Sequence, residues 1–170
     1  MKKVLLDTNL LLLFILGCAS RANIGRHKRL RDFSEFEFDN LVGLLSSATK
    51  LVTTPHILAE TSNLLDIGKR ADVATVSLFT EFVCNAEEVS IAAEAAVAHP
   101  SFARFGLTDT VIHHIVTDRV FVLTVDRALY GSLSKMGAEV INIRHSYPLT
   151  GQGYRIWIFR PSNENIVRTT

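Results

Sequence analysis

The feature that most constrains the fold is a series of short strand-like segments separated by helical segments. Residues 3–7, 51–53, 120–125 and 139–143 are predicted strands, and VFVLTV at 120–125 is an almost continuous apolar run. Such a run is typical of a strand covered on both faces. Strands that alternate with helices favour a parallel sheet with right-handed crossovers. The sequence therefore predicts an α/β fold, a three-layer α/β/α sandwich around a mostly parallel sheet.

Helix signals fill the intervals between these strands. Ser34 and Glu37 have the spacing of a capping box, and Thr54 followed by Pro55 is typical of a helix start. Residues 19–32 are polar and basic, which indicates a loop or a loosely held helix. Another helix is predicted to begin at Thr108, with Val111, Ile112, Ile115 and Val116 buried. The remaining predicted helices are one that begins at Leu10, two near 71–84 and 87–98, and one over Leu129–Met136 that ends before Gly137.

The chain is predicted to form one domain. Residues 1–147 would make the main body of the domain, and 148–170 a C-terminal extension of the same domain, with an edge strand in the alternating segment 154–159. The formal net charge is only +1, so a polyanionic partner would have to be met by a local patch. Two cysteines, Cys18 and Cys84, match no disulfide framework and are predicted to be buried free thiols.

The N-terminus superficially resembles an export signal, because two lysines precede an apolar stretch that ends at Cys18. Asp7 and Asn9 argue against that interpretation, since an acid at the centre of an inserted segment costs roughly 2.5–3.5 kcal/mol. The uninterrupted run Leu10–Leu16 is also too short to span a bilayer. We therefore expect a buried strand and helix, and a cytoplasmic protein.

Four acidic residues are predicted to meet at one edge of the sheet. Asp7 and Asp126 each end a strand, and Glu60 and Asp109 lie in helices that begin or end at the same edge. In parallel sheets the ligand crevice lies beyond the carboxyl ends of the strands. Four carboxylates in one cleft repel each other unless cations are present. The arrangement therefore predicts a divalent-metal site.

Each acid also has a simpler structural explanation. Asp7 and Asp126 would serve as helix N-caps, and Asp109 would complement a helix dipole. Glu60 is harder to explain in this way, because it borders an apolar helix stripe. A phosphotransferase with Asp7 as nucleophile would want a second acid at position 9, where the chain has Asn9.

Four sequence blocks, in order, resemble the PIN-domain family of metal-dependent ribonucleases, which includes the toxins of many toxin–antitoxin pairs. The blocks are LLDTNLLL, ILAE, LTDT and VLTVDRAL. The resemblance implies that Asp7, Glu60, Asp109 and Asp126 are the catalytic and metal-site acids. It also aligns Thr124 with the family's hydroxyl residue, and Asn9 with the polar residue after the first acid. These two residues would orient the acids as second-shell groups.

Hard oxygen ligands favour Mg²⁺ or Mn²⁺ over zinc. One or two such ions would activate water and neutralise the phosphate, and paired ions sit about 3.5–4 Å apart. The resemblance implies endonucleolytic cleavage of RNA that leaves a 5′-phosphate. His113 and His114 follow Asp109 by about one turn, but the carboxylates suffice as ligands, and partly buried or solvated histidines account for them.

The densest positive charge lies in the 19–32 segment. Its residues Arg26, Lys28, Arg29 and Arg31 either contact an RNA backbone or form a solvated face. Other expected partners are an antitoxin protein, from the resemblance, and a second copy of the chain. The alternative function is a catalytically silent PIN-like module that binds RNA or protein.

Overall fold

The computed structural model describes residues 3–116 and 120–145, and their core is a parallel five-stranded sheet in the order β3-β2-β1-β4-β5. At its centre Val4 pairs with Leu51 on one side and with Phe121 on the other. The strands are β1 (Lys3–Leu6), β2 (Lys50–Thr53), β3 (Glu87–Glu88), β4 (Val120–Thr124) and β5 (Val140–Asn142). The α/β architecture predicted from the sequence is confirmed.

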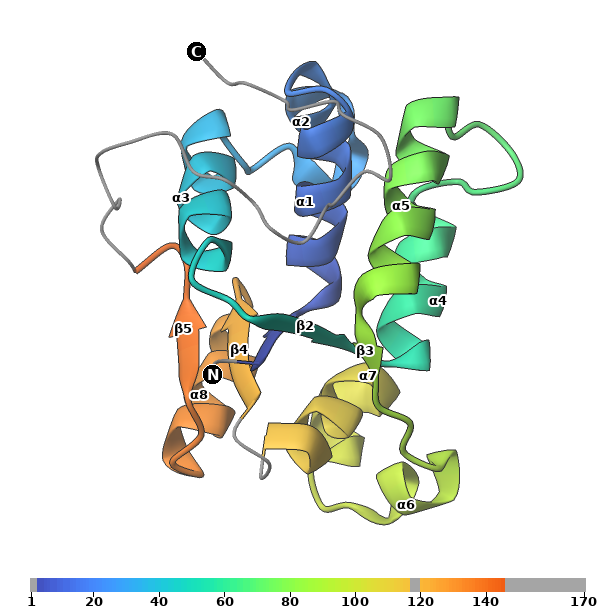
Figure 1. Cartoon of the computed structure of the whole chain (residues 1–170). Helices are drawn as coiled ribbons and strands as arrows, with labels where there is room; N and C mark the ends of the chain where they lie inside the picture. The colour runs from blue at the N-terminus through green and yellow to red at the C-terminus, as the bar shows by residue number, and fades with distance from the viewer. Residues whose placement is uncertain (1–2, 117–119, 146–170) are drawn as a thin grey trace.

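Helices cover both faces of the sheet (Figure 1). From β1 the chain moves outward to β2 and β3, and right-handed crossovers put the intervening helices on one face. It then returns to β4 and moves the opposite way to β5, so the later helices cover the other face. The first group is α1 (Thr8–Ala19), α2 (Ala22–Arg26), the 3₁₀ turn η1 (Lys28–Leu30), α3 (Glu35–Leu45), α4 (Pro55–Leu64) and α5 (Val73–Asn85), and the second is α6 (Ala93–Ala98), α7 (Phe102–Ile115) and α8 (Arg127–Lys135).

Helix α1 is the central element of the core. Every residue from Leu10 to Gly17 is buried, because α2, α3, α4 and α5 all pack around this helix. A Cβ on Gly17 would lie 2.4 Å from the ring of Phe38, so glycine permits the close approach of α3. The N-terminal apolar stretch is therefore a core strand and helix, as expected. No helix in the described segments is both long and apolar enough to cross a bilayer.

Three of the predicted helix-end signals are confirmed. Ser34 and Glu37 form the reciprocal capping box at the start of α3. The Thr54 hydroxyl caps α4 by accepting from the Ile57 N–H at 3.1 Å. Gly137, with φ of 77°, follows α8 in the left-handed region that favours glycine. The basic segment 19–32 folds into α2 and η1, of which α2 is a single short helix of 5 residues.

The helix predicted over 87–98 is wrong in its first half. Glu87 and Glu88 form β3 and pair in parallel with Val52 and Thr53 of β2. The Lys3 ammonium lies 2.5 Å from the Glu87 carboxylate and reinforces this edge. Only Ala93–Ala98 is helical. The strand edge of β2 decides the conformation of Glu87 and Glu88, and the alanine-rich part of the predicted helix, from Ala92 onward, is the part that becomes helical.

Two further expectations need correction. The helical geometry of α7 breaks at Gly106, with φ of 74° and ψ of −174°, rather than starting at a Thr108 cap. The positions expected to be buried beyond it are buried. Cys84 is exposed on α5, whereas Cys18 is largely enclosed and burial raises the pKa of its thiol to about 12. The expected edge strand at 154–159 lies outside the described residues.

Candidate functional site

The site lies where the direction of chain winding reverses. Strands β1 and β4 are neighbours, and the helices that follow them, α1 and α8, leave toward opposite faces of the sheet. Such a reversal opens a crevice beyond the carboxyl ends of the two strands. Asp7 is the first residue after β1, and Asp126 is the second residue after β4. Two of the four predicted acids therefore flank this crevice.

Asp7 is buried and heavily hydrogen-bonded. Its Oδ1 accepts from the Leu10 N–H at 2.7 Å, which makes it the N-cap of α1. Its Oδ2 accepts from the Thr124 hydroxyl, and from the Val125 N–H at 3.2 Å. Burial raises the pKa of Asp7, and the nearby Asp126 charge adds to the rise against the lowering effect of these bonds. A carboxylate offers about four lone-pair positions, so about one remains for a further ligand.

Thr124 joins Asp7 to Asp126. While its hydroxyl donates to Asp7, the same oxygen accepts from the Asp126 N–H at 2.9 Å. The Asp126 carboxylate caps α8 through Oδ1, which accepts from the Ala128 and Leu129 N–H groups at 2.6 and 2.8 Å. The side chain is exposed, so Oδ2 is accessible. The predicted orienting role of Thr124 has a direct structural basis in these bonds.

Both simple explanations offered for Asp7 and Asp126 are therefore correct, because each caps a helix. The capping bonds leave acceptor positions on each carboxylate for other partners. Asp7 is also tied to the neighbouring strand, and Asp126 uses one oxygen only. A helix cap and a metal ligand are compatible roles for one carboxylate, since it has two oxygens to share.

Glu60 approaches the site from α4. The side chain is half-buried, and its Oε2 accepts from the hydroxyl of Thr8 at 3.0 Å. Thr8 directly follows Asp7, so this bond brings the fourth acid to the start of α1. Asn9 was the orienting residue expected from the sequence at this position, and Thr8 was not predicted. The signal for Thr8 was its hydroxyl, adjacent to the first acid at the end of a buried strand.

Asp109 has a strongly perturbed carboxyl group. It lies on α7 beyond the Gly106 break, and among the described residues no hydrogen bond reaches its carboxylate. Burial raises its pKa to about 7, with further increases from the charges of Asp7, Asp126 and Glu60. All four acids are therefore close enough to influence one charge. Strong perturbation in a cleft is characteristic of functional sites.

The four acids surround the crevice without converging on one point. Within residues 3–116 and 120–145, no three acidic, histidine or cysteine side chains stand in the geometry of a shared metal ion. Mutual repulsion and the capping bonds both favour separated carboxylates in a metal-free chain. The donor set nevertheless fits Mg²⁺ or Mn²⁺, because every candidate ligand is a carboxylate oxygen.

The basic segment reaches the site at one residue. The Nε of Arg29 donates to Oδ1 of Asn9 at 3.3 Å, so this guanidinium lies beside the start of α1. Asn9 thus contacts Arg29, and within the described residues its side chain makes no hydrogen bond to an acid. Arg26, Lys28 and Arg31 are also exposed.

A separate cavity of about 240 Å³ lies elsewhere, lined in part by Arg26, His27 and Arg70. It also touches Leu16, which is roughly 13 Å beyond Asp7 along the axis of α1. The cavity therefore does not belong to the acidic crevice.

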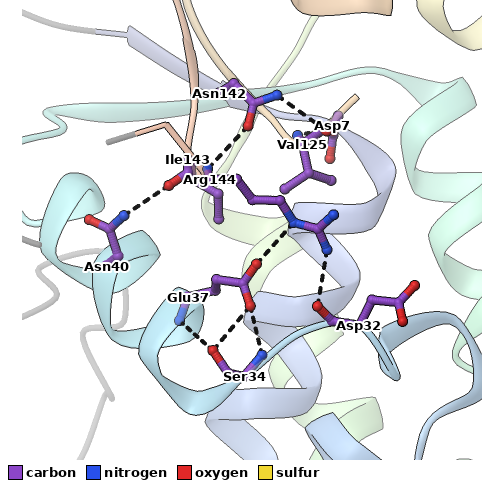
Figure 2. A network of polar contacts seen from close by, with 9 residues as sticks. All are labelled: Asp7, Asp32, Ser34, Glu37, Asn40, Val125, Asn142, Ile143 and Arg144. Atoms are coloured by element: carbon purple, nitrogen blue, oxygen red, sulfur yellow. Dashed lines mark hydrogen bonds and ion pairs between the residues drawn. The ribbon is translucent and has the colours of Figure 1, made fainter. Parts of the chain in front are cut away.

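Two buried polar residues support the crevice and were not assigned this role from sequence. His113 is 2% exposed, with Nδ1 at 2.8 Å from the Asp109 carbonyl and Nε2 at 2.9 Å from the Ser132 hydroxyl of α8. A carbonyl only accepts, so Nδ1 carries the proton. Asn142, at the end of β5, bonds to the backbone before Asp126 (Figure 2). The only sequence signal for Asn142 was that a polar residue ends a short strand segment.

Comparison with known proteins adds no relative to this description. No protein-family model matches the chain, and no curated protein is detectably similar to it in sequence.

Proposed function

We propose that this protein is a divalent-metal-dependent endoribonuclease of the PIN type. The observation that carries the proposal is the presence of Asp7, Glu60, Asp109 and Asp126 around the crevice between β1 and β4, near enough to raise the pKa of Asp109 together. Four mutually repelling carboxylates at a ligand-binding edge are explained by a cation that neutralises them.

The residues have separate roles in this mechanism. Asp7, Asp109 and Asp126 would hold Mg²⁺ or Mn²⁺, and Glu60 would complete the coordination or orient the attacking water. The bound ion supplies Lewis-acid activation of the phosphate and lowers the pKa of bound water. Thr124 fixes the rotamer of Asp7 and the backbone of Asp126. Asp109 must release its proton before it can bind a cation near neutral pH.

Arg29 is the residue best placed to receive RNA. It lies next to Asn9 at the rim of the crevice, where a guanidinium would offset the repulsion between the acids and a phosphodiester. A cytoplasmic protein acting on RNA, with or without an antitoxin partner, is the setting that this proposal implies. Cleavage would leave a 5′-phosphate.

The competing function is a PIN-like module that binds RNA without cutting it. It is favoured by one observation: helix capping gives both Asp7 and Asp126 a structural role that requires no metal. One experiment distinguishes the two functions. The protein is incubated with mixed RNA in Mn²⁺, in Mg²⁺ and with chelator, and the products are tested for a 5′-phosphate.

Asp7→Asn is the informative variant. Asparagine is as good an N-cap as aspartate, so α1 should remain capped while the ligand charge is lost. We expect cleavage to disappear and the fold to persist with a lower melting temperature, because the amide NH2 replaces the oxygen that accepts from the Val125 N–H. Asp72→Asn is the matched control, because Asp72 caps α5 in the same way through the Thr75 N–H at 2.7 Å. Cleavage that survives in Asp7→Asn, or that resists chelation, would refute the proposal.

A further inference from the structure

Asn142 is a buried amide at the same sheet edge as the acids. It is the last residue of β5, is 2% exposed, and pairs with Thr124 in the register of β4 and β5. Both ends of its amide are used. The Nδ2 donates to the Val125 carbonyl at 3.3 Å, and the Oδ1 accepts from the Arg144 N–H at 3.1 Å (Figure 2).

The bond to Val125 fixes the peptide that connects Val125 to Asp126. That peptide unit is planar, so its carbonyl and its N–H turn together. Asn142 holds the carbonyl, while the N–H, which belongs to Asp126, donates to the Thr124 hydroxyl. The preceding N–H, that of Val125, donates to Asp7. The turn between β4 and α8 therefore connects Asn142 with both Asp7 and Asp126.

Asn142 is itself held in place from the side away from the acids. Arg144 extends to α3, where its Nε donates to Glu37 at 3.0 Å, and its Nη2 donates to the Asp32 carbonyl at 3.1 Å. Asn40, also on α3, donates to the Ile143 carbonyl at 3.1 Å. Figure 2 shows these contacts as one network from α3 to Asp7. Arg144, whose N–H donates to the Asn142 Oδ1, is thus anchored to α3, so the amide of Asn142 has a fixed direction.

We propose that Asn142 is a positioning residue of the acidic site, which sets the relative placement of Asp7 and Asp126 through the Val125–Asp126 peptide. The role requires an amide, because one end must donate to a carbonyl and the other must accept from an N–H. A carboxylate of the same shape would put an oxygen against the Val125 carbonyl. The expected effect of Asn142 on metal affinity rests on the proposed nuclease function. Its effect on the turn between β4 and α8 rests on the geometry alone.

The test compares Asn142→Ala with Asn40→Ala. Asn40 is a matched control because it is also buried and also donates to a backbone carbonyl next to the end of β5, but on the side of α3. The first readout is amide hydrogen exchange in metal-free protein. We expect the Val125 and Asp126 amides to exchange about tenfold faster in Asn142→Ala, and less than about twofold faster in Asn40→Ala, which loosens only the Ile143 end of the network. The Ile143 amide, bonded to the Thr124 carbonyl at 3.0 Å, reports whether the sheet stays paired.

The second readout is the dissociation constant of Mn²⁺, measured by calorimetry. We expect it to rise about tenfold in Asn142→Ala and by less than about twofold in Asn40→Ala. If Asn142→Ala fails to fold, Asn142→Asp replaces it in the first readout, because it keeps the shape and the acceptor for Arg144 but loses the donor and places an oxygen against the Val125 carbonyl. Its added charge would alter cation binding directly, so hydrogen exchange of Val125 and Asp126 decides for this variant. Equal effects of the Asn142 and Asn40 variants on both readouts would overturn the proposal.

The two proposals fail in different ways. A wild-type protein that binds no Mn²⁺ and cuts no RNA would overturn the proposed nuclease function and the metal-binding consequence drawn here. Hydrogen exchange would still decide whether Asn142 fixes the turn. A wild-type protein that binds Mn²⁺, together with an Asn142 variant whose Mn²⁺ affinity and Val125 exchange are unchanged, would overturn the positioning role alone.

Discussion

The hydroxyl of Thr124 donates a hydrogen bond to Oδ2 of Asp7, and so joins residues 117 positions apart in the sequence. Both residues are buried, and each stands at or just beyond the carboxyl end of one of two neighbouring strands. The bond lowers the pKa of Asp7 against the increase that burial causes. It therefore helps to keep a buried carboxylate ionised at the position where the proposed cation would bind.

Replacing Thr124 with valine tests this relationship. The change keeps the shape but removes the hydroxyl, so Asp7 loses a donor and the Asp126 N–H loses its acceptor. We expect a loss of about 1–3 kcal/mol in the free energy of unfolding, measured with urea, because buried groups are left unpaired. Mn²⁺ affinity should fall by about 10–100-fold.

Thr53→Val is the matched control for that experiment. Thr53 ends β2 and is equally buried, but within the described residues its hydroxyl oxygen has no hydrogen-bond partner. Valine there should leave stability unchanged or raise it. Equal destabilisation by the two substitutions would show that the Thr124 hydroxyl contributes nothing specific.

Asp109→Asn should stabilise the metal-free protein at alkaline pH. The folded pKa of Asp109, about 7, is above its ordinary value of 3.8. The ionised group therefore destabilises the fold. This destabilisation is zero below the unfolded pKa, grows as the pH rises toward 7, and is constant above pH 7. The melting temperature of the variant should exceed that of wild type at pH 8, by about 2–4 °C for each kcal/mol gained, and match it near pH 4.

Added Mn²⁺ should reverse this order. The cation would stabilise wild type by binding to the native state, and the asparagine variant would lose most of that effect. A variant that is less stable than wild type in chelator at pH 8 would contradict the charge repulsion inferred for Asp109.

Most strands follow from local signals, whereas the order of the strands in the sheet was not predicted, and the placement of the acids at one edge required the topology. Residues 51–53 and 120–124 are strands as expected, since continuous apolar runs with turn residues at their ends leave few alternatives. Glu87 and Glu88 could not be assigned as β3, because their strand geometry depends on the free edge of β2. The helical turn before the Gly106 break was not predicted, because the helix was expected to begin at Thr108.

The supporting residues of the site were harder to predict than the acids. Asp7 and Asp126 follow recognisable strands, so their position at one edge could be deduced. Thr8, His113 and Asn142 act through contacts with residues distant in sequence or with backbone groups. Only the folded chain shows which of many Thr, His and Asn side chains have that role, since their sequence surroundings are unremarkable for buried polar residues.

Metal binding should release a proton from Asp109. Near pH 6 its carboxyl is mostly protonated in the metal-free protein, because its pKa is about 7. A cation would displace that proton, so Mn²⁺ affinity should increase with pH up to about 8 and then level off. Calorimetry in two buffers of different ionisation enthalpy at pH 6 measures the release directly. We expect close to one proton for wild type at pH 6, and almost none at pH 8.5.

Arg29 should matter more for RNA than Arg26, although both lie in the basic segment. Arg29 contacts Asn9 at the rim of the crevice, whereas Arg26 lines the separate cavity. Arg29→Gln should weaken RNA binding and reduce the slope of log K against log salt by about 1, the effect of one lost phosphate contact. Arg26→Gln carries the same charge change and should leave that slope at the wild-type value. Filter binding of RNA in Ca²⁺ or chelator, from 50 to about 200 mM salt, separates the two substitutions from any effect on cleavage. Identical slopes for the two variants would mean that the basic segment 19–32 attracts RNA only through its overall charge, with no phosphate contact specific to Arg29.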